Sequence, residues 1–128
     1  MRDANTKCSD NLAATGIGTI DCIRHNFKRP CSIGDLQKGE KLVFVGQFRY
    51  INMDYLFFSS LSFTDIVCLV MSYDIACQWH IKLWECMFNF PHYFHFDGDI
   101  KMVTFLVPKF HLPAHVEKFQ TAFSFNLT

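Results

Sequence analysis

Asp74 is the residue whose type and position best suit chemistry. It directly follows the apolar run from Asp65 to Tyr73 and precedes a segment with helical spacing. Open α/β sheets place ligands and catalytic groups at the carboxyl ends of their strands. A carboxylate there can bind Mg²⁺, usually with a second carboxylate or with phosphate oxygens. The alternative is that Asp74 only caps the helix that follows.

Two Cys-x-x-His pairs supply thiols and imidazoles, which are zinc ligands. They are Cys22 with His25 and Cys77 with His80. Together they contain the four ligands of a tetrahedral zinc site. Nothing in the sequence brings the two pairs together, however, and such pairs arise easily by chance. Cys77 as a core thiol, with His80 as a surface side chain of the same helix, is the alternative.

His111 and His115 lie four residues apart beyond the apolar segment 101–107. This spacing suits half of a metal site or a polar wall of an active site. Solvent-facing turn histidines would show the same spacing. A Cys–His hydrolase built from Cys77 and His111 would need an activated thiol, and the sequence offers no feature that activates one.

The elements that must position these residues alternate along the chain. Apolar patterning and turn residues predict a strand over 16–25, a loop over 26–39, helices over 53–61, 75–89 and 115–125, and strands over 65–73 and 101–107. The run at 65–73 suits a strand that is covered on both faces. The fold class is therefore α/β with an at least partly parallel sheet, preceded by a polar segment over 1–15.

Composition limits the classes of function. The 128 residues allow one domain, and half of them are hydrophobic, including 15 Phe. Lys plus Arg equals Asp plus Glu at 12 each, so no net charge draws the whole chain to nucleic acid. We find no membrane-spanning stretch and no signal peptide, and we expect an intracellular protein with reduced cysteines.

From Gly16 to Asn126 the chain resembles the catalytic domain of the Kyakuja-Dileera-Zisupton (KDZ) transposases, a DDE transposase class found in fungi. Six segments match in the same order. They are Gly18–His25, Gly34–Glu40, Asn52–Tyr55, Ser72–Trp79, Val107–His115 and Phe123–Asn126.

The resemblance implies an RNase H-like fold in which two Asp and one Glu bind Mg²⁺ or Mn²⁺ for cut-and-paste transfer of DNA in the nucleus. It makes Asp74 the second of those acidic residues. Cys77 and His80 resemble the Cys-x-x-His that several transposase families carry just after that Asp, and they join Asp74 as candidate metal ligands. His111 and His115 stay candidates for the wall of the active site.

The chain also departs from the family pattern. The first catalytic Asp is expected upstream of these residues, and the segment with the final Glu is expected after Asn126. Phe119 stands where the family usually has Cys, and residues 41–48 form an atypical insert that we interpret as translated intron. We therefore expect a partial RNase H-like domain over 16–128, incomplete at both ends and inactive alone.

Two other classes of function stay open. One is a domesticated, non-catalytic interaction module that uses exposed Phe, and the other is a small zinc-binding structural domain. A missing neighbour strand would also leave the run from Ile66 to Met71 unpaired, which favours self-association of the isolated fragment.

Overall fold

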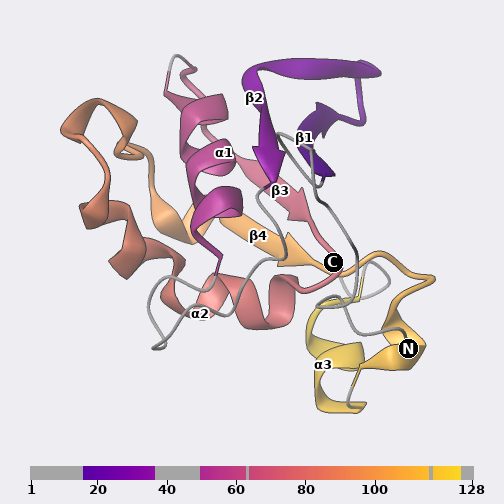
Figure 1. Cartoon of the computed structure of the whole chain (residues 1–128). Coiled ribbons are helices and arrows are strands. Elements are labelled where there is room, and N and C mark those ends of the chain that lie inside the picture. The colour runs from indigo at the N-terminus through magenta and orange to yellow at the C-terminus, as the bar shows by residue number, and fades with distance from the viewer. Residues whose placement is uncertain (1–15, 37–49, 63, 116, 125–128) are drawn as a thin grey trace, which may run out of the picture. The chain divides into compact units, whose positions relative to one another are not determined.

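The computed structural model describes residues 16–36, 50–62, 64–115 and 117–124 (Figure 1). The polar segment 1–15 and the insert at 41–48 lie outside the described residues. The chain is a mixed α/β protein, and within the described residues its four strands form two separate two-stranded sheets. It divides into two compact units, residues 1–63 with 86–96 and residues 64–85 with 97–128.

An antiparallel hairpin begins the first unit. Strand β1 (Gly16–Cys22) pairs with β2 (Phe27–Leu36), and Gly18 stands opposite Gly34. Helix α1 (Ile51–Leu61) lies beside the hairpin (Figure 1). A Cβ atom at Gly18 would lie 2.6 Å from the Leu56 side chain, and one at Gly34 would lie 2.9 Å from it. Only glycine at these two positions lets the helix approach so closely.

The loop predicted over 26–39 is wrong for most of its length, because β2 occupies Phe27–Leu36. Pro30 and Gly34 favour a loop in most contexts. The strand accepts Pro30 because the pairing is irregular there. Thr19 pairs with Ile33, and Asp21 pairs with Lys28. Between these pairs, Ile20 is the one residue of β1 opposite the four residues 29–32 of β2. A proline at such a bulge removes no hydrogen bond from the ladder.

The predicted helix over 53–61 is confirmed, and it begins slightly earlier, at Ile51. Its buried side chains include the adjacent Phe57 and Phe58, whose ring centroids lie 5.3 Å apart. Two short 3-10 helices, η2 (Met87–Asn89) and η3 (His92–Phe94), complete the first unit. Aromatic rings join them to α1, because Phe58 lies 5.9 Å from Phe90 and Tyr55 lies 5.4 Å from Phe94.

The second unit is built on a parallel β-α-β motif. Strand β3 (Leu69–Ser72), helix α2 (Ala76–Cys86) and strand β4 (Val103–Leu106) follow one another, and β3 pairs with β4 in parallel. All of α2 except its last residue belongs to this unit. The buried Trp79 and Leu83 lie one helical turn apart on α2.

The end of the second unit folds back on β4. The short helices η4 (Ile100–Met102) and η5 (Leu112–Ala114) flank this strand along the chain, and α3 (Glu117–Ala122) follows. The backbone N–H of Val107 donates to the Phe123 carbonyl at 3.0 Å. Val107 packs in a buried cluster with Ala76 and Cys77, so the start of α2 and the end of β4 share one core.

The order of helices and strands in this unit agrees with the sequence prediction, but the strands are shorter. β3 covers four residues of the predicted 65–73, and β4 covers four of 101–107. The expected cover on both faces of β3 is also wrong, because Val70 is 56% exposed. The helix predicted over 75–89 ends as 3-10 turn at 87–89, and the one predicted over 115–125 is reduced to α3.

None of the described helices is long and apolar enough to cross a membrane.

Candidate functional site

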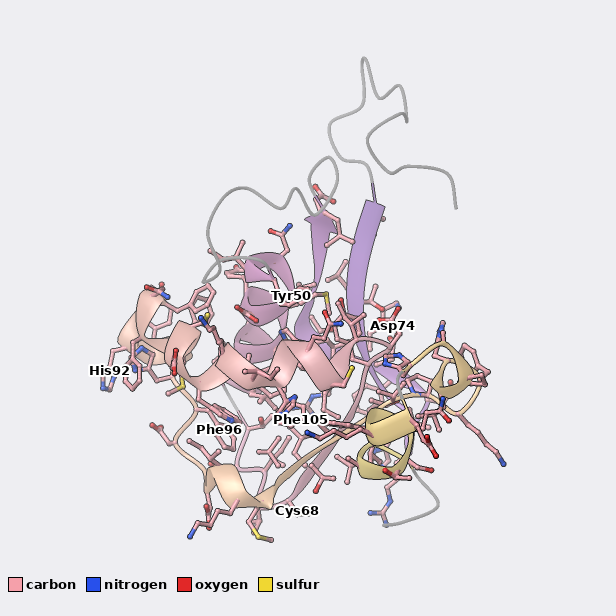
Figure 2. All side chains as sticks on the ribbon, turned by 90° about the horizontal axis from the view of Figure 1, so that it is seen from below. Tyr50, Cys68, Asp74, His92, Phe96 and Phe105 are labelled. Atoms are coloured by element: carbon pink, nitrogen blue, oxygen red, sulfur yellow. The ribbon has the colours of Figure 1, made fainter. Side chains whose placement is uncertain are left out.

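Asp74 lies where the chain turns from β3 into α2, and Figure 2 shows it at the N-terminal end of that helix. The Tyr73 N–H donates to the Leu106 carbonyl at 3.0 Å, which extends the parallel ladder up to the residue before Asp74. The side chain is half-buried. No group in the described residues donates a hydrogen bond to its carboxylate, so nothing in this part of the chain engages Asp74 as a helix cap.

A second segment leaves the same edge of the sheet. β3 and β4 are parallel and Ser72 is paired with Leu106, so Asp74 and the segment 108–115 both follow carboxyl ends of strands. The segment consists of tight turns, in which the His111 N–H donates to the Pro108 carbonyl at 2.9 Å and the Ala114 N–H to the His111 carbonyl at 3.0 Å. We call residues 108–115 the edge loop.

The edge loop reaches α2 through a thiol–imidazole contact. Cys77 Sγ lies 3.2 Å from Nδ1 of His115. Burial raises the pKa of the Cys77 thiol, and the negative charge of Asp74 raises it further. The thiol is therefore protonated at neutral pH and can donate to Nδ1 of His115. A buried thiol of raised pKa is a poor nucleophile, which argues against hydrolase chemistry at Cys77.

His80 has a structural environment. Its Nδ1 lies 2.8 Å from the Ala76 carbonyl, one turn back on α2, and therefore carries a proton. Its ring centroid lies 5.6 Å from that of Phe105 and 5.1 Å from that of Phe123. His80 is half-buried and contacts both rings, so the alternative of a surface side chain is wrong. Only Nε2 is left for a metal ion.

The other Cys-x-x-His pair lies in the first unit. Cys22 Sγ and Nδ1 of His25 lie 3.2 Å apart at the exposed turn between β1 and β2. Among the described residues, no group of three His, Cys, Asp or Glu side chains is arranged to hold a metal ion, so neither pair belongs to a set of three metal ligands there.

The two histidines proposed as an active-site wall have different surroundings. His115 contacts Cys77, whereas the His111 ring lies against Phe110 with centroids 4.3 Å apart. Sequence reasoning missed both contacts. The 38 residues between Cys77 and His115 hide that pairing from any local pattern. The prolines on either side of Phe110 indicate turns, and from these turns the sequence could have predicted that the Phe110 side chain is exposed.

Comparisons with known proteins place the chain in a family. No curated protein and no solved structure matches it significantly. The sequence profile described as "Kyakuja-Dileera-Zisupton transposase" matches residues 1–128. Because that match spans the whole sequence, the chain belongs to the KDZ transposase family.

Proposed function

We propose that this chain forms part of the RNase H-like catalytic domain of a cut-and-paste DNA transposase, with Asp74 as one of its acidic metal ligands. The position of Asp74 carries the proposal: it is a half-buried carboxylate at the carboxyl end of a parallel strand, and no described residue donates a hydrogen bond to it. The family match supports the chemistry that we propose, which is phosphodiester transfer on DNA. We assign the protein to the nucleus on the same basis.

Asp74 fits a divalent ion as one ligand and does not complete a site. A carboxylate supplies one or two oxygens, whereas Mg²⁺ takes about six, with water and substrate phosphates among them. The described residues add no group that would finish the set. We propose that DNA phosphates, water and the other acidic residues of the family pattern do so. A bound metal ion would stabilise the charge that develops on phosphate oxygens.

The remaining candidate residues hold Asp74 in place. The Tyr73–Leu106 hydrogen bond fixes the backbone next to it. One turn into α2, Cys77 contacts His115 and thereby joins the helix to the edge loop. His80 stabilises the same helix through Ala76. We propose that these are positioning residues, and that zinc is not needed for the fold.

Iron-directed cleavage tests the assignment of Asp74. Fe²⁺ with ascorbate replaces Mg²⁺ and breaks the backbone close to its ligands. The 128-residue chain alone presents one of the expected acids, and we expect it to bind no metal ion. The test therefore uses the product of the complete reading frame, which should be cut near Asp74 and protected by excess Mg²⁺. Asp74→Asn should suppress this cut. Asp65→Asn is the matched control, because Asp65 is an exposed aspartate before the amino end of β3. Equal cleavage in both variants would contradict the assignment.

Activity is tested on two proteins. We expect no strand transfer by the 128-residue chain in Mg²⁺ or Mn²⁺, because it presents one of the three expected acids. The product of the complete reading frame, determined from the transcript and the flanking genomic sequence, should transfer strands. Asp74→Asn should then abolish transfer, and Asp65→Asn should retain it. Transfer by the Asp74→Asn protein would overturn the proposed function.

A further inference from the structure

Phe110 is an exposed aromatic side chain in an ordered part of the chain. It is 79% exposed, on a loop that hydrogen-bonded turns and two prolines hold in shape. The His111 N–H donates to the Pro108 carbonyl, and the Leu112 N–H to the Lys109 carbonyl at 3.4 Å. Its exposure is therefore a property of a hydrogen-bonded turn. Single exposed apolar side chains are normal on protein surfaces, so a binding contact at Phe110 must be inferred from the neighbours of this residue.

The Phe110 ring lies beside the ring of the adjacent residue, His111. The His111 ring lies 4.3 Å away between centroids, with an angle of 43° between the planes. Within the described residues no other ring is packed against Phe110. The exposed Phe110 ring leaves room for a planar group to lie on it, and a nucleobase is such a group. A base can offer a whole face only when it is unpaired and unstacked from its neighbours.

The charge around Phe110 suits a nucleic acid. The edge loop contains Lys109, which is exposed and directly precedes Phe110, together with two histidines and no acidic residue. A lysine beside a stacking aromatic is the usual combination in proteins that hold single-stranded DNA, in which the cation meets the phosphate and the ring meets the base. The chain has zero net charge, and Lys109 places one positive charge directly beside Phe110 in this loop.

The place of the edge loop links these features to Asp74. Both follow carboxyl ends of paired parallel strands. We propose that Phe110 stacks on an unpaired base of the DNA strand whose phosphate is presented to Asp74, with Lys109 on the adjoining phosphate. The proposal rests on the proposed function and deepens it, because it assigns a residue that selects frayed or unpaired DNA ends.

Photocrosslinking in EDTA tests the proposal without using metal or catalysis. The 128-residue chain is mixed at low salt with a DNA hairpin that carries 5-iodouracil in a short unpaired 3′ end, and with a fully paired hairpin of equal phosphate count. Crosslinks from the unpaired end should map to Phe110. Phe110→Ala should weaken binding of that DNA by roughly 5- to 150-fold and change binding of the paired hairpin little.

Two variants complete the design. Phe88→Ala is the matched control, because Phe88 is 73% exposed and also lies beside a histidine ring, that of His95 at 5.6 Å. It should leave both affinities unchanged. Lys109→Gln should weaken binding of both DNAs alike and reduce the salt dependence. Circular dichroism should show that all three variants keep the fold, since each changes an exposed side chain.

The proposal fails if Phe110→Ala binds the unpaired end as well as the parent chain does, or if it loses both DNAs equally. It also fails if the variant changes only self-association, which would assign Phe110 to a protein contact. Each of these results leaves the iron-cleavage test of Asp74 unaffected. Conversely, if the unsubstituted protein shows no iron cut near Asp74 but the Phe110 crosslink is retained, the metal assignment alone is overturned.

Discussion

The Cys77 thiol lies 3.2 Å from Nδ1 of His115, although the two residues are 38 positions apart. Cys77 is 1% exposed and lies one turn into α2, whereas His115 closes the edge loop. The contact therefore joins the two segments that follow the parallel strands. It gives Cys77 a structural role in holding the edge at which Asp74 lies.

A double-mutant cycle should measure this contact. Cys77→Ala and His115→Ala each remove it, and we expect a coupling of about 0.5–1.5 kcal/mol in the free energy of unfolding, as for a typical protein hydrogen bond. Cys77→Ala alone should cost more than the coupling, because it also leaves a small cavity in the core. Urea unfolding of the four proteins provides the values. If the two single substitutions change the free energy of unfolding additively, the contact contributes nothing to stability.

The raised pKa of Cys77 predicts a loss of stability at alkaline pH. Burial, reinforced by the charge of Asp74, raises the pKa above its ordinary value of 9.0. The folded protein then retains a proton that the unfolded chain has lost, so this contribution is complete below pH 9 and declines as the pH rises toward the folded-state pKa. Unfolding free energies from about pH 8 to 10.5 should fall less steeply in Cys77→Ala.

Asp74→Asn provides an internal check on this prediction. Removing the carboxylate charge should lower the folded-state pKa of Cys77 and make the alkaline decline shallower. Asp65→Asn should leave the profile unchanged, because Asp65 is not among the groups that shift this thiol. Identical profiles for the parent chain and Asp74→Asn would show that Asp74 does not act on Cys77.

The hairpin glycines give a prediction for the first unit. An alanine Cβ at Gly18 would lie 2.6 Å from Leu56, which is 2% exposed and has little room to move. We expect Gly18→Ala to destabilise the protein by about 1–3 kcal/mol through overpacking. Gly16→Ala is the control, because its Cβ would meet Leu36 at an ordinary 3.7 Å. Thermal unfolding that is equal in both variants would contradict the close packing of α1 on the hairpin.

Local patterns in the sequence predicted the second unit well. The apolar run, the aspartate and the helical spacing of Trp79 and Leu83 are contiguous, so strand, turn and helix follow from neighbouring residues. The position of Asp74 at a strand end follows for the same reason. The limits of β3 did not follow, because its length depends on pairing with β4, which is distant in sequence.

Non-local packing explains what the sequence did not predict. β2 contains Pro30 and Gly34, which are turn residues in most contexts. The strand exists because β1 pairs with it, and because Gly34 accommodates Leu56 from a helix later in the chain. The same reason hid the partner of Cys77. Neighbouring residues suggested His80, whose Nδ1 is engaged by the Ala76 carbonyl.

Val70 gives the last prediction, which concerns self-association. In the described residues β3 pairs only with β4, and Val70 is 56% exposed on it, opposite the exposed Thr104. We propose that this open strand associates with a second copy of the chain. Val70→Thr keeps a β-branched side chain but removes apolar surface, and it should weaken association by roughly tenfold in sedimentation velocity. Ile81→Gln, on the exposed face of α2 where Ile81 is 64% exposed, should have little effect. A chain that stays monomeric at high concentration, or equal effects of the two substitutions, would exclude β3 as the associating surface.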